Sequence, residues 1–224
     1  MAERIDLGPV LKFLAGLAKN NNKPWFEAHR EQYEESMATF QTLVGLFING
    51  MSRLVDLDGL NPKDCIMRIY RDVRFSKDKS PYKTGLGAGI APGGRKSGRM
   101  GFHVQVGPDG ATMVASGLWD PTPQQLSHFR NAIVDDAGPF LTIIGASAFR
   151  KHFGKIIGES LKTTPRGYPP DHPQQDLLRR KQVCVSEKFP DSVVTSAKFP
   201  ELAIASMEAM KPFIDYLNEV ALRA

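Results

Sequence analysis

Apolar side chains recur at helical spacing through the first quarter of the chain. Residues 7–19 carry leucine or valine at every third or fourth position. Residues 24–55 repeat an aromatic side chain every seven positions and end with Leu54 in the same register. Two helices are therefore predicted over these ranges, each with one face in the hydrophobic core. Gly45 and Gly50 are the positions at which the second helix is expected to be weakest.

The pattern changes to alternation after the turn-forming residues 58–62. Strands are predicted over 65–71, 85–91, 99–107 and 111–117. The sequence Pro-Asp-Gly at 108–110 predicts a hairpin turn, and the residues from Pro92 begin a loop. Closely spaced strands of this kind predict an antiparallel meander.

The remainder of the chain returns mainly to helical spacing. Helices are predicted over 121–135, 138–153, 173–181 and 199–222, with a strand over 182–187. Asp171 is the expected N-cap of the short third helix, whereas in the last helix Leu202 should face inward and Pro212 should introduce a kink. Helices, then strands, then helices predict an α+β fold in which N-terminal and C-terminal helices pack on an antiparallel meander sheet. The length of 224 residues fits a single domain over 1–224.

Composition places the chain among globular proteins, since 42% of its residues are hydrophobic and 24% are charged. No apolar run approaches the roughly 20 residues of a membrane-spanning helix, and residues 1–6 do not begin a secretory signal. A soluble, cytoplasmic protein without a membrane partner is expected. Cys65 and Cys184 lie far apart and outside any C-x-x-C pair, which favours two buried free thiols in a reducing compartment.

Positive charge is concentrated in one segment. The whole chain has a net charge of +5. Between Arg68 and Arg99, nine basic residues accompany two acidic ones, a net charge of +7 that leaves −2 for the rest of the chain. Charge gathered in this way indicates a local site more than a uniformly basic surface.

Three parts of this segment supply the candidate ligand-binding residues: a strand-like stretch at 68–75, a polar loop at 76–83 and a glycine-rich loop at 92–99. The candidates are Arg68, Tyr70, Arg71, Asp72, Arg74, Lys77, Lys79, Tyr82, Lys83, Arg95 and Lys96. Guanidinium groups hold phosphate or carboxylate through paired hydrogen bonds, lysine adds a point charge, and glycine lets backbone amides approach an anion. Arg71 falls on the apolar side of the predicted strand, so we expect it to form a buried pair with a carboxylate.

Recognised catalytic and cofactor motifs are missing from the sequence. The five histidines lack metal-ligand spacing, the Walker pattern is unmatched, and the glycines at 85–89 do not form a dinucleotide fingerprint. No metal, no cofactor and no identifiable catalytic residue are therefore expected. His103 could face either the site or solvent, and His172 beside Asp171 is a weaker acid/base candidate than Asp171 is a helix cap.

Long stretches of the chain resemble one known family. They include Trp25-Phe26, the whole run from Arg68 to Lys83, residues 92–98, Gly117-Leu118-Trp119 and Asp171-His172-Pro173. These residues are similar to the family catalogued as domain of unknown function 2461 (DUF2461), and the likeness covers nearly the whole chain. The resemblance implies a conserved hypothetical protein without an assigned activity, so it carries over no catalytic residue. His103 stands where the resemblance leads us to expect an aromatic side chain.

Three interpretations of the basic segment stay open at the level of sequence. The first is a site for a phosphate- or carboxylate-bearing ligand, in a binding module or an enzyme of unknown class. The second is nucleic-acid binding, with Tyr70, Phe75 and Tyr82 as stacking platforms between the cations. The third is a structural network in which the arginines pair with Asp72, Asp78 and acids of the first two helices, such as Glu27 and Glu31. The oligomeric state is not predicted.

Overall fold

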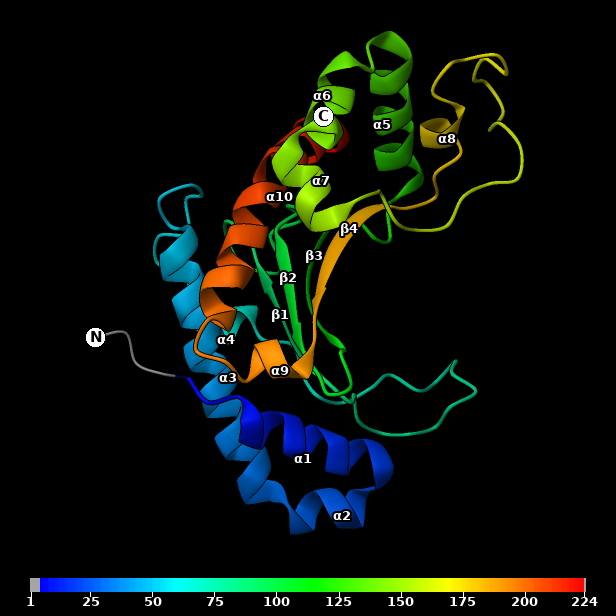
Figure 1. Cartoon of the computed structure of the whole chain (residues 1–224). Coiled ribbons are helices and arrows are strands. Elements are labelled where there is room, and N and C mark those ends of the chain that lie inside the picture. The colour runs from blue at the N-terminus through cyan, green and yellow to red at the C-terminus, as the bar shows by residue number, and fades with distance from the viewer. Residues whose placement is uncertain (1–4, 224) are drawn as a thin grey trace. The chain divides into compact units, whose positions relative to one another are not determined.

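The computed structural model describes residues 5–223 of the chain. Within that range the helices are α1 (Gly8–Lys19), α2 (Lys23–Ala28), α3 (Arg30–Met51), α4 (Pro62–Cys65), α5 (Pro123–Asp135), α6 (Gly138–Gly145), α7 (Ser147–Phe153), α8 (Gln175–Leu178), α9 (Asp191–Val194) and α10 (Phe199–Ala221). The strands are β1 (Leu86–Ile90), β2 (Phe102–Val106), β3 (Thr112–Leu118) and β4 (Val183–Phe189) (Figure 1).

The chain divides into two compact units. The first comprises the chain up to Ser97 together with Phe102–Val114 and Lys188–Ala205. The second comprises Gly98–Gly101, Ala115–Glu187 and the chain from Ser206 onward. The expectation of a single domain over 1–224 stays a prediction.

The strands form one sheet in the order β1-β2-β3-β4. β1 pairs antiparallel with β2, from Leu86 opposite Val106 to Ile90 opposite Phe102. The α+β class and the antiparallel meander are thereby confirmed. Every second residue of β1 and β2 is buried, so the less buried face of this strand pair carries glycine on β1 and the side chains of His103 and Gln105 on β2. That face has room for a pocket.

The core of the first unit follows the predicted apolar stripe. α1 packs on α3, and α3 packs on β1 (Figure 1). Phe26, Phe40 and Phe47 are fully buried, as their seven-residue spacing predicts. Leu54 and Leu202 were expected to face inward, but both are exposed. The stripe loses Leu54 because α3 ends at Met51.

The helix predicted over 24–55 is interrupted at His29, which separates α2 from α3. His29 has φ −117° and ψ 25°, outside the helical region. Its ring stacks on Trp25 with the centroids 3.9 Å apart, and its Nδ1 lies 2.8 Å from the carbonyl oxygen of Trp25. Gly50, in contrast, remains helical within α3, and a Cβ at this position would lie 2.5 Å from Cδ1 of Ile204. The glycine at this position allows close packing and does not break the helix.

The strand predicted over 65–71 is wrong. α4 ends at Cys65, and the residues after it make only the isolated bridges Ile66 to Ala88 and Tyr70 to Tyr82 among the described residues. Between these two bridges, three residues (67–69) face five (83–87), so the two segments do not keep a common register. Beyond them, Pro81 accepts a hydrogen bond from the Arg71 N–H at 2.9 Å but has no N–H with which to extend the pairing.

The helices of the second unit begin in different ways. Thr122 and Gln125 form a reciprocal capping box at the start of α5, whereas the N-cap residues of α6, α7 and α8 provide no side-chain cap. The helix predicted over 138–153 is divided into α6 and α7, because Ala146 takes an extended ψ of 141°. Asp171 is not an N-cap, since α8 begins later and its N-cap residue is Gln174. The kink at Pro212 stays a prediction, although this proline does lie within α10.

Cys65 and Cys184 are both free and buried, as the sequence predicts. Burial raises the pKa of the Cys184 thiol to about 12, so it stays protonated at neutral pH. Among residues 5–223 there is no helix with the length and apolarity needed to cross a bilayer.

Candidate functional site

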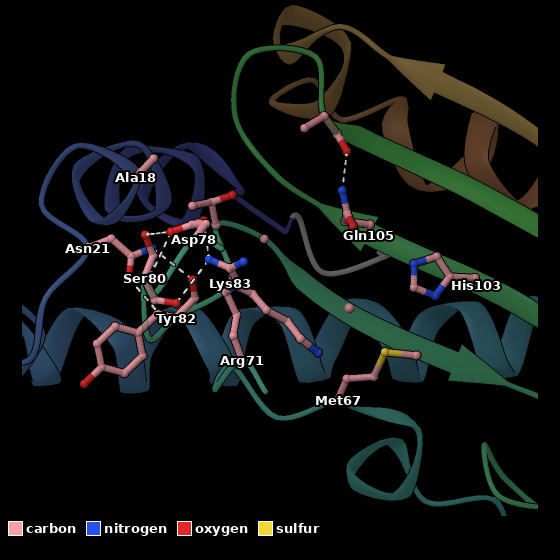
Figure 2. Close-up of a pocket in the computed structure, with 14 residues that line it drawn as sticks. Ala18, Asn21, Met67, Arg71, Asp78, Ser80, Tyr82, Lys83, His103 and Gln105 are labelled. Atoms are coloured by element: carbon pink, nitrogen blue, oxygen red, sulfur yellow. Dashed lines mark hydrogen bonds and ion pairs between the residues drawn. The ribbon is translucent and has the colours of Figure 1, made fainter. Parts of the chain in front are cut away.

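A cavity of about 550 Å³ opens on the less buried face of β1 and β2, within the first unit (Figure 2). It is lined by the end of α1, the segment after α4, the loop that leads into β1, and the two strands. The lining residues are Ala18, Asn21, Met67, Arg71, Asp78, Ser80, Tyr82, Lys83, Thr84, Gly85, Gly87, His103, Gln105 and Ala111. Small-molecule sites usually occupy between about 300 and 1,000 Å³, so the cavity has the size of a ligand pocket.

One end of the pocket is neutralised internally by Arg71 and Asp78. Nη1 of Arg71 lies 2.5 Å from a carboxylate oxygen of Asp78 and also donates to the carbonyl oxygen of Ser80 at 3.1 Å. Asp78 accepts two further hydrogen bonds, from the backbone N–H and the hydroxyl of Ser80 at 2.9 and 2.6 Å. The hydrogen bonds from Ser80, followed by that from Arg71, lower the pKa of Asp78 to about 2.

The carboxylate partner expected for Arg71 is therefore present, but the pair is not buried. The side chain of Arg71 is 27% exposed and that of Asp78 is 62% exposed. The expectation of a buried pair is wrong because Arg71 lies beyond the last bridge to the sheet, where the loop that carries Asp78 is open to solvent.

Lys83 is a different kind of cation. Its side chain is partly buried and extends along the pocket away from the Arg71–Asp78 pair (Figure 2). Burial, together with the positive charges of Arg68 and Arg95, lowers the pKa of Lys83. No carboxylate among the described residues forms an ion pair with it. The pocket thus contains an ammonium group whose charge the surrounding protein disfavours.

His103 stands near Lys83 on the same face of the sheet. Burial and the charge of Lys83 both lower the pKa of this histidine, so its imidazole is neutral at pH 7. In the pairing of β1 with β2, His103 is opposite Gly89, and a Cβ added at Gly87 would lie 3.6 Å from its Cε1. Because Gly87 and Gly89 have no side chains, the pocket extends over β1 beside the imidazole of His103.

Residues 9–216 match the family described as conserved hypothetical protein (DUF2461). The chain belongs to this family. The match confirms the resemblance seen in the motifs. No curated protein and no solved structure matches the chain. The DUF2461 assignment covers both compact units but gives no reaction, so the site has to be interpreted from its own chemistry.

In this DUF2461 chain the predicted site residues fall into two groups. Arg71, Tyr82 and Lys83 line the pocket, and Arg68 and Arg95 lie near enough to Lys83 to influence its titration. The other candidates do not line the pocket; they are Tyr70, Asp72, Arg74, Lys77, Lys79 and Lys96. Their assignment to ligand binding stays a prediction.

The loop at 72–79 neutralises part of its own charge. Arg74 donates to Asp72, with Nη2 and the carboxylate oxygen 2.7 Å apart, and Nζ of Lys79 donates to the carbonyl oxygen of Val73 at 2.9 Å. The acids of the first helices do not join this cluster in the way that the structural interpretation expects, since Glu27 instead lies 3.7 Å from Arg30. The ion pairs are local to the loop.

Asn21 is the structural residue that sequence reasoning missed. Its Nδ2 donates to the carbonyl oxygen of Tyr82 at 2.9 Å, and its Oδ1 accepts from the Tyr82 N–H at 3.0 Å. The Tyr82 ring stacks on Phe26 with the centroids 4.1 Å apart. Asn21 and Phe26 together hold the residue next to Lys83 in place. The asparagine run after α1 was the only available signal, and it does not reveal a partner 61 residues away.

The polar cluster at 166–173 contributes a local cap instead of an acid/base pair. Nδ1 of His172 accepts a hydrogen bond from the backbone N–H of Gln174 at 3.1 Å, and Asp171 is exposed. Across residues 5–223, no group of three or more histidine, cysteine, aspartate and glutamate side chains is arranged to hold a metal ion.

Proposed function

We propose that this protein binds a small phosphate- or carboxylate-bearing ligand in the pocket around Lys83. The observation that carries the proposal is Lys83 itself, a partly buried cation with two arginines nearby and no carboxylate partner in the described chain. Burying a charge without a partner is unfavourable, and neighbouring like charges increase the cost. A bound anion would offset both effects.

Neutral groups around the lysine are suited to orienting such a ligand. Gln105 offers an amide and Thr84 a hydroxyl, and both line the pocket together with the neutral imidazole of His103. These groups can donate to or accept from the oxygen atoms of an anion. An enzymatic role would use His103 as a proton acceptor beside the bound anion, since a histidine with a lowered pKa is unprotonated at neutral pH.

Isothermal titration calorimetry with inorganic phosphate and with a panel of phosphorylated and carboxylated small molecules tests the proposal. We expect saturable binding that Lys83→Gln weakens by about tenfold or more, because a charge-assisted hydrogen bond is lost. Lys12→Gln is the matched control, since Lys12 is an exposed lysine on α1 that does not line the pocket. Absence of binding across the panel at low salt, or equal losses in both variants, would refute the proposal.

The second candidate function is single-stranded nucleic-acid binding by the loop at 72–79. The ring of Phe75 is 96% exposed, and the Arg74 guanidinium lies 5.9 Å from its centroid. An exposed aromatic ring beside cations is the arrangement on which nucleic-acid bases stack. Tyr82, in contrast, is only 3% exposed and is occupied by its stack with Phe26, so it is unavailable as a platform.

Salt dependence distinguishes the two candidates. Binding of an oligonucleotide through several phosphates loses affinity steeply with salt, with a slope of about −0.7 per contact on a single strand. If the loop binds nucleic acid, Phe75→Ala should reduce oligonucleotide affinity and leave phosphate binding unchanged. Oligonucleotide binding that is undetectable at low salt removes this candidate.

A further inference from the structure

A second cavity lies wholly within the second unit and combines apolar walls with cations. It has a volume of about 600 Å³ and lies among α6, α7, the residues after α7, and α8. Its apolar walls are formed by Leu141, Ile144, Phe149, Ile156 and Leu177. Phe149, Ile156 and Leu177 are buried, whereas Leu141 is exposed in spite of its apolar side chain. The cavity is therefore open at one side and apolar at its base.

Three cations line the same cavity: Arg150, Lys155 and Arg180. No acidic residue lines it, and none of the three forms an ion pair within residues 5–223. The Arg150 guanidinium reaches back over α6, since its Nη2 lies 4.0 Å from the position of a Cβ added at Gly145. Charge in this cavity is thus entirely positive.

Arg180 is the most informative of these cations. Its Nε is buried and makes no hydrogen bond in the part of the chain that the structure describes, while its Nη1 makes only a long contact of 3.4 Å to the Gly158 carbonyl oxygen. Its backbone is fixed, because Arg180 bridges to Ser160 and its carbonyl oxygen accepts from Arg130 at 3.0 Å. The described chain therefore satisfies little of the hydrogen-bonding capacity of this guanidinium, and Arg180 lines the cavity, where its remaining N–H groups can donate to a bound acceptor.

We propose that this cavity binds an amphiphilic organic anion, namely a carboxylate with an aliphatic tail. The carboxylate would accept from the guanidinium of Arg180, with Arg150 or Lys155 adding positive charge. The tail would cover the apolar wall formed by Leu141, Ile144 and Phe149. Binding pockets of this size commonly combine apolar walls with a few polar groups that fix the orientation of the ligand. The lining residues differ from those of the pocket around Lys83, so this site is independent of the first proposal.

Sodium octanoate, used below its micellar concentration, is the probe. We expect saturable binding of octanoate by calorimetry, and binding of acetate at least about tenfold weaker, since acetate lacks the methylene groups that bury apolar surface. Octylammonium, which has the same tail and the opposite charge, should not bind. Equal binding of octanoate and octylammonium would overturn the proposal, because the aliphatic tail alone would then determine the affinity.

Variants assign the binding to this cavity. Arg180→Gln should weaken octanoate binding by about tenfold or more, and Arg180→Lys should weaken it less, since it keeps the charge and loses the paired hydrogen bonds. Arg150→Gln, at an exposed position, gives the same test if Arg180→Gln does not fold. Arg53→Gln is the control, because Arg53 is exposed in the first unit.

Two further results would also contradict the proposal. One is octanoate affinity that neither Arg180→Gln nor Arg150→Gln reduces relative to Arg53→Gln. The other is an absence of octanoate binding together with binding of an acidic, apolar peptide, which would make the surface a protein-docking site.

Discussion

Asn21→Ala should loosen the segment that carries Lys83 and destabilise the whole protein. The side chain removed makes two hydrogen bonds to the backbone of Tyr82, one to its N–H and one to its carbonyl oxygen. Tyr82 is only 3% exposed, so water replaces these bonds poorly. With a net value of about 0.5 to 1.5 kcal/mol for each hydrogen bond, the loss is about 1 to 3 kcal/mol. For a protein of this length, a loss of about 2 kcal/mol lowers Tm by about 4 to 8 °C.

Thermal denaturation followed by circular dichroism measures the change. Asn20→Ala is the matched control, because Asn20 is exposed and its side-chain amide donates to the carbonyl oxygen of Gly16 in the adjoining helix, at 3.0 Å, and not to Tyr82. Amide hydrogen exchange gives a local measurement, since the Tyr82 N–H should be protected in the wild type and exchange quickly in Asn21→Ala. Equal Tm values for the two variants, or unchanged protection of the Tyr82 amide, would refute the assigned role of Asn21.

Four further predictions follow from the titrating groups and the glycines. The pKa of Lys83 in the folded protein is below its value of 10.5 in the unfolded chain, so between the two values the unfolded chain binds more protons than the folded one. In that pH range, the free energy of unfolding measured by urea titration should rise with pH, and Lys83→Gln should remove this rise. Sulfate, whose charge is constant, should bind more tightly as pH falls below the lowered pKa of His103, and this gain should be absent from titrations of His103→Asn. Arg71→Met should lower Tm only slightly, because its ion pair with Asp78 is partly exposed and not buried. In this variant the hydrogen bonds from Ser80 should still keep the pKa of Asp78, measured by NMR, below 3.8. Gly117→Ala should cost at least about 3 kcal/mol in urea denaturation, because its φ is 127° and the added Cβ would lie 2.1 Å from the carbonyl oxygen of Val183.

Periodicity predicts the helices and the meander well and fails at single-residue events. The break at His29 is invisible to it, because the apolar repeat continues across the break and the rings of Phe26 and Tyr33 still meet, with their centroids 4.9 Å apart. Gly50 has the opposite effect, since a residue with low helix propensity stays helical where Ile204 packs closely against it. The break at His29 accompanies a local contact with Trp25, and the close packing at Gly50 is a tertiary contact with Ile204. The spacing of apolar residues contains neither.

The false strand at 65–71 reflects a register that alternation does not contain. Cys65 ends α4, and between the bridges Ile66 to Ala88 and Tyr70 to Tyr82 three residues face five, so the two segments pair only at isolated positions. The site is harder to predict. The density of cations is visible in the sequence, but the pocket also contains Asn21, which follows α1 and pairs with Tyr82. It also contains His103 and Gln105 from β2, whose positions depend on strand register.

The distribution of acids explains why one basic segment contains two kinds of cation. The two acids of the segment, Asp72 and Asp78, form ion pairs with Arg74 and Arg71 in the exposed loop. No acid of the segment remains for Lys83, whose side chain is partly buried. A purely structural network would place a carboxylate beside Lys83, and a purely solvated loop would leave its ammonium group in water, where its pKa would not be lowered by burial. Because neither arrangement is present among the described residues, the pocket supports the proposal of a ligand that brings its own negative charge, and loss of phosphate binding in Lys83→Gln is the result on which that proposal depends.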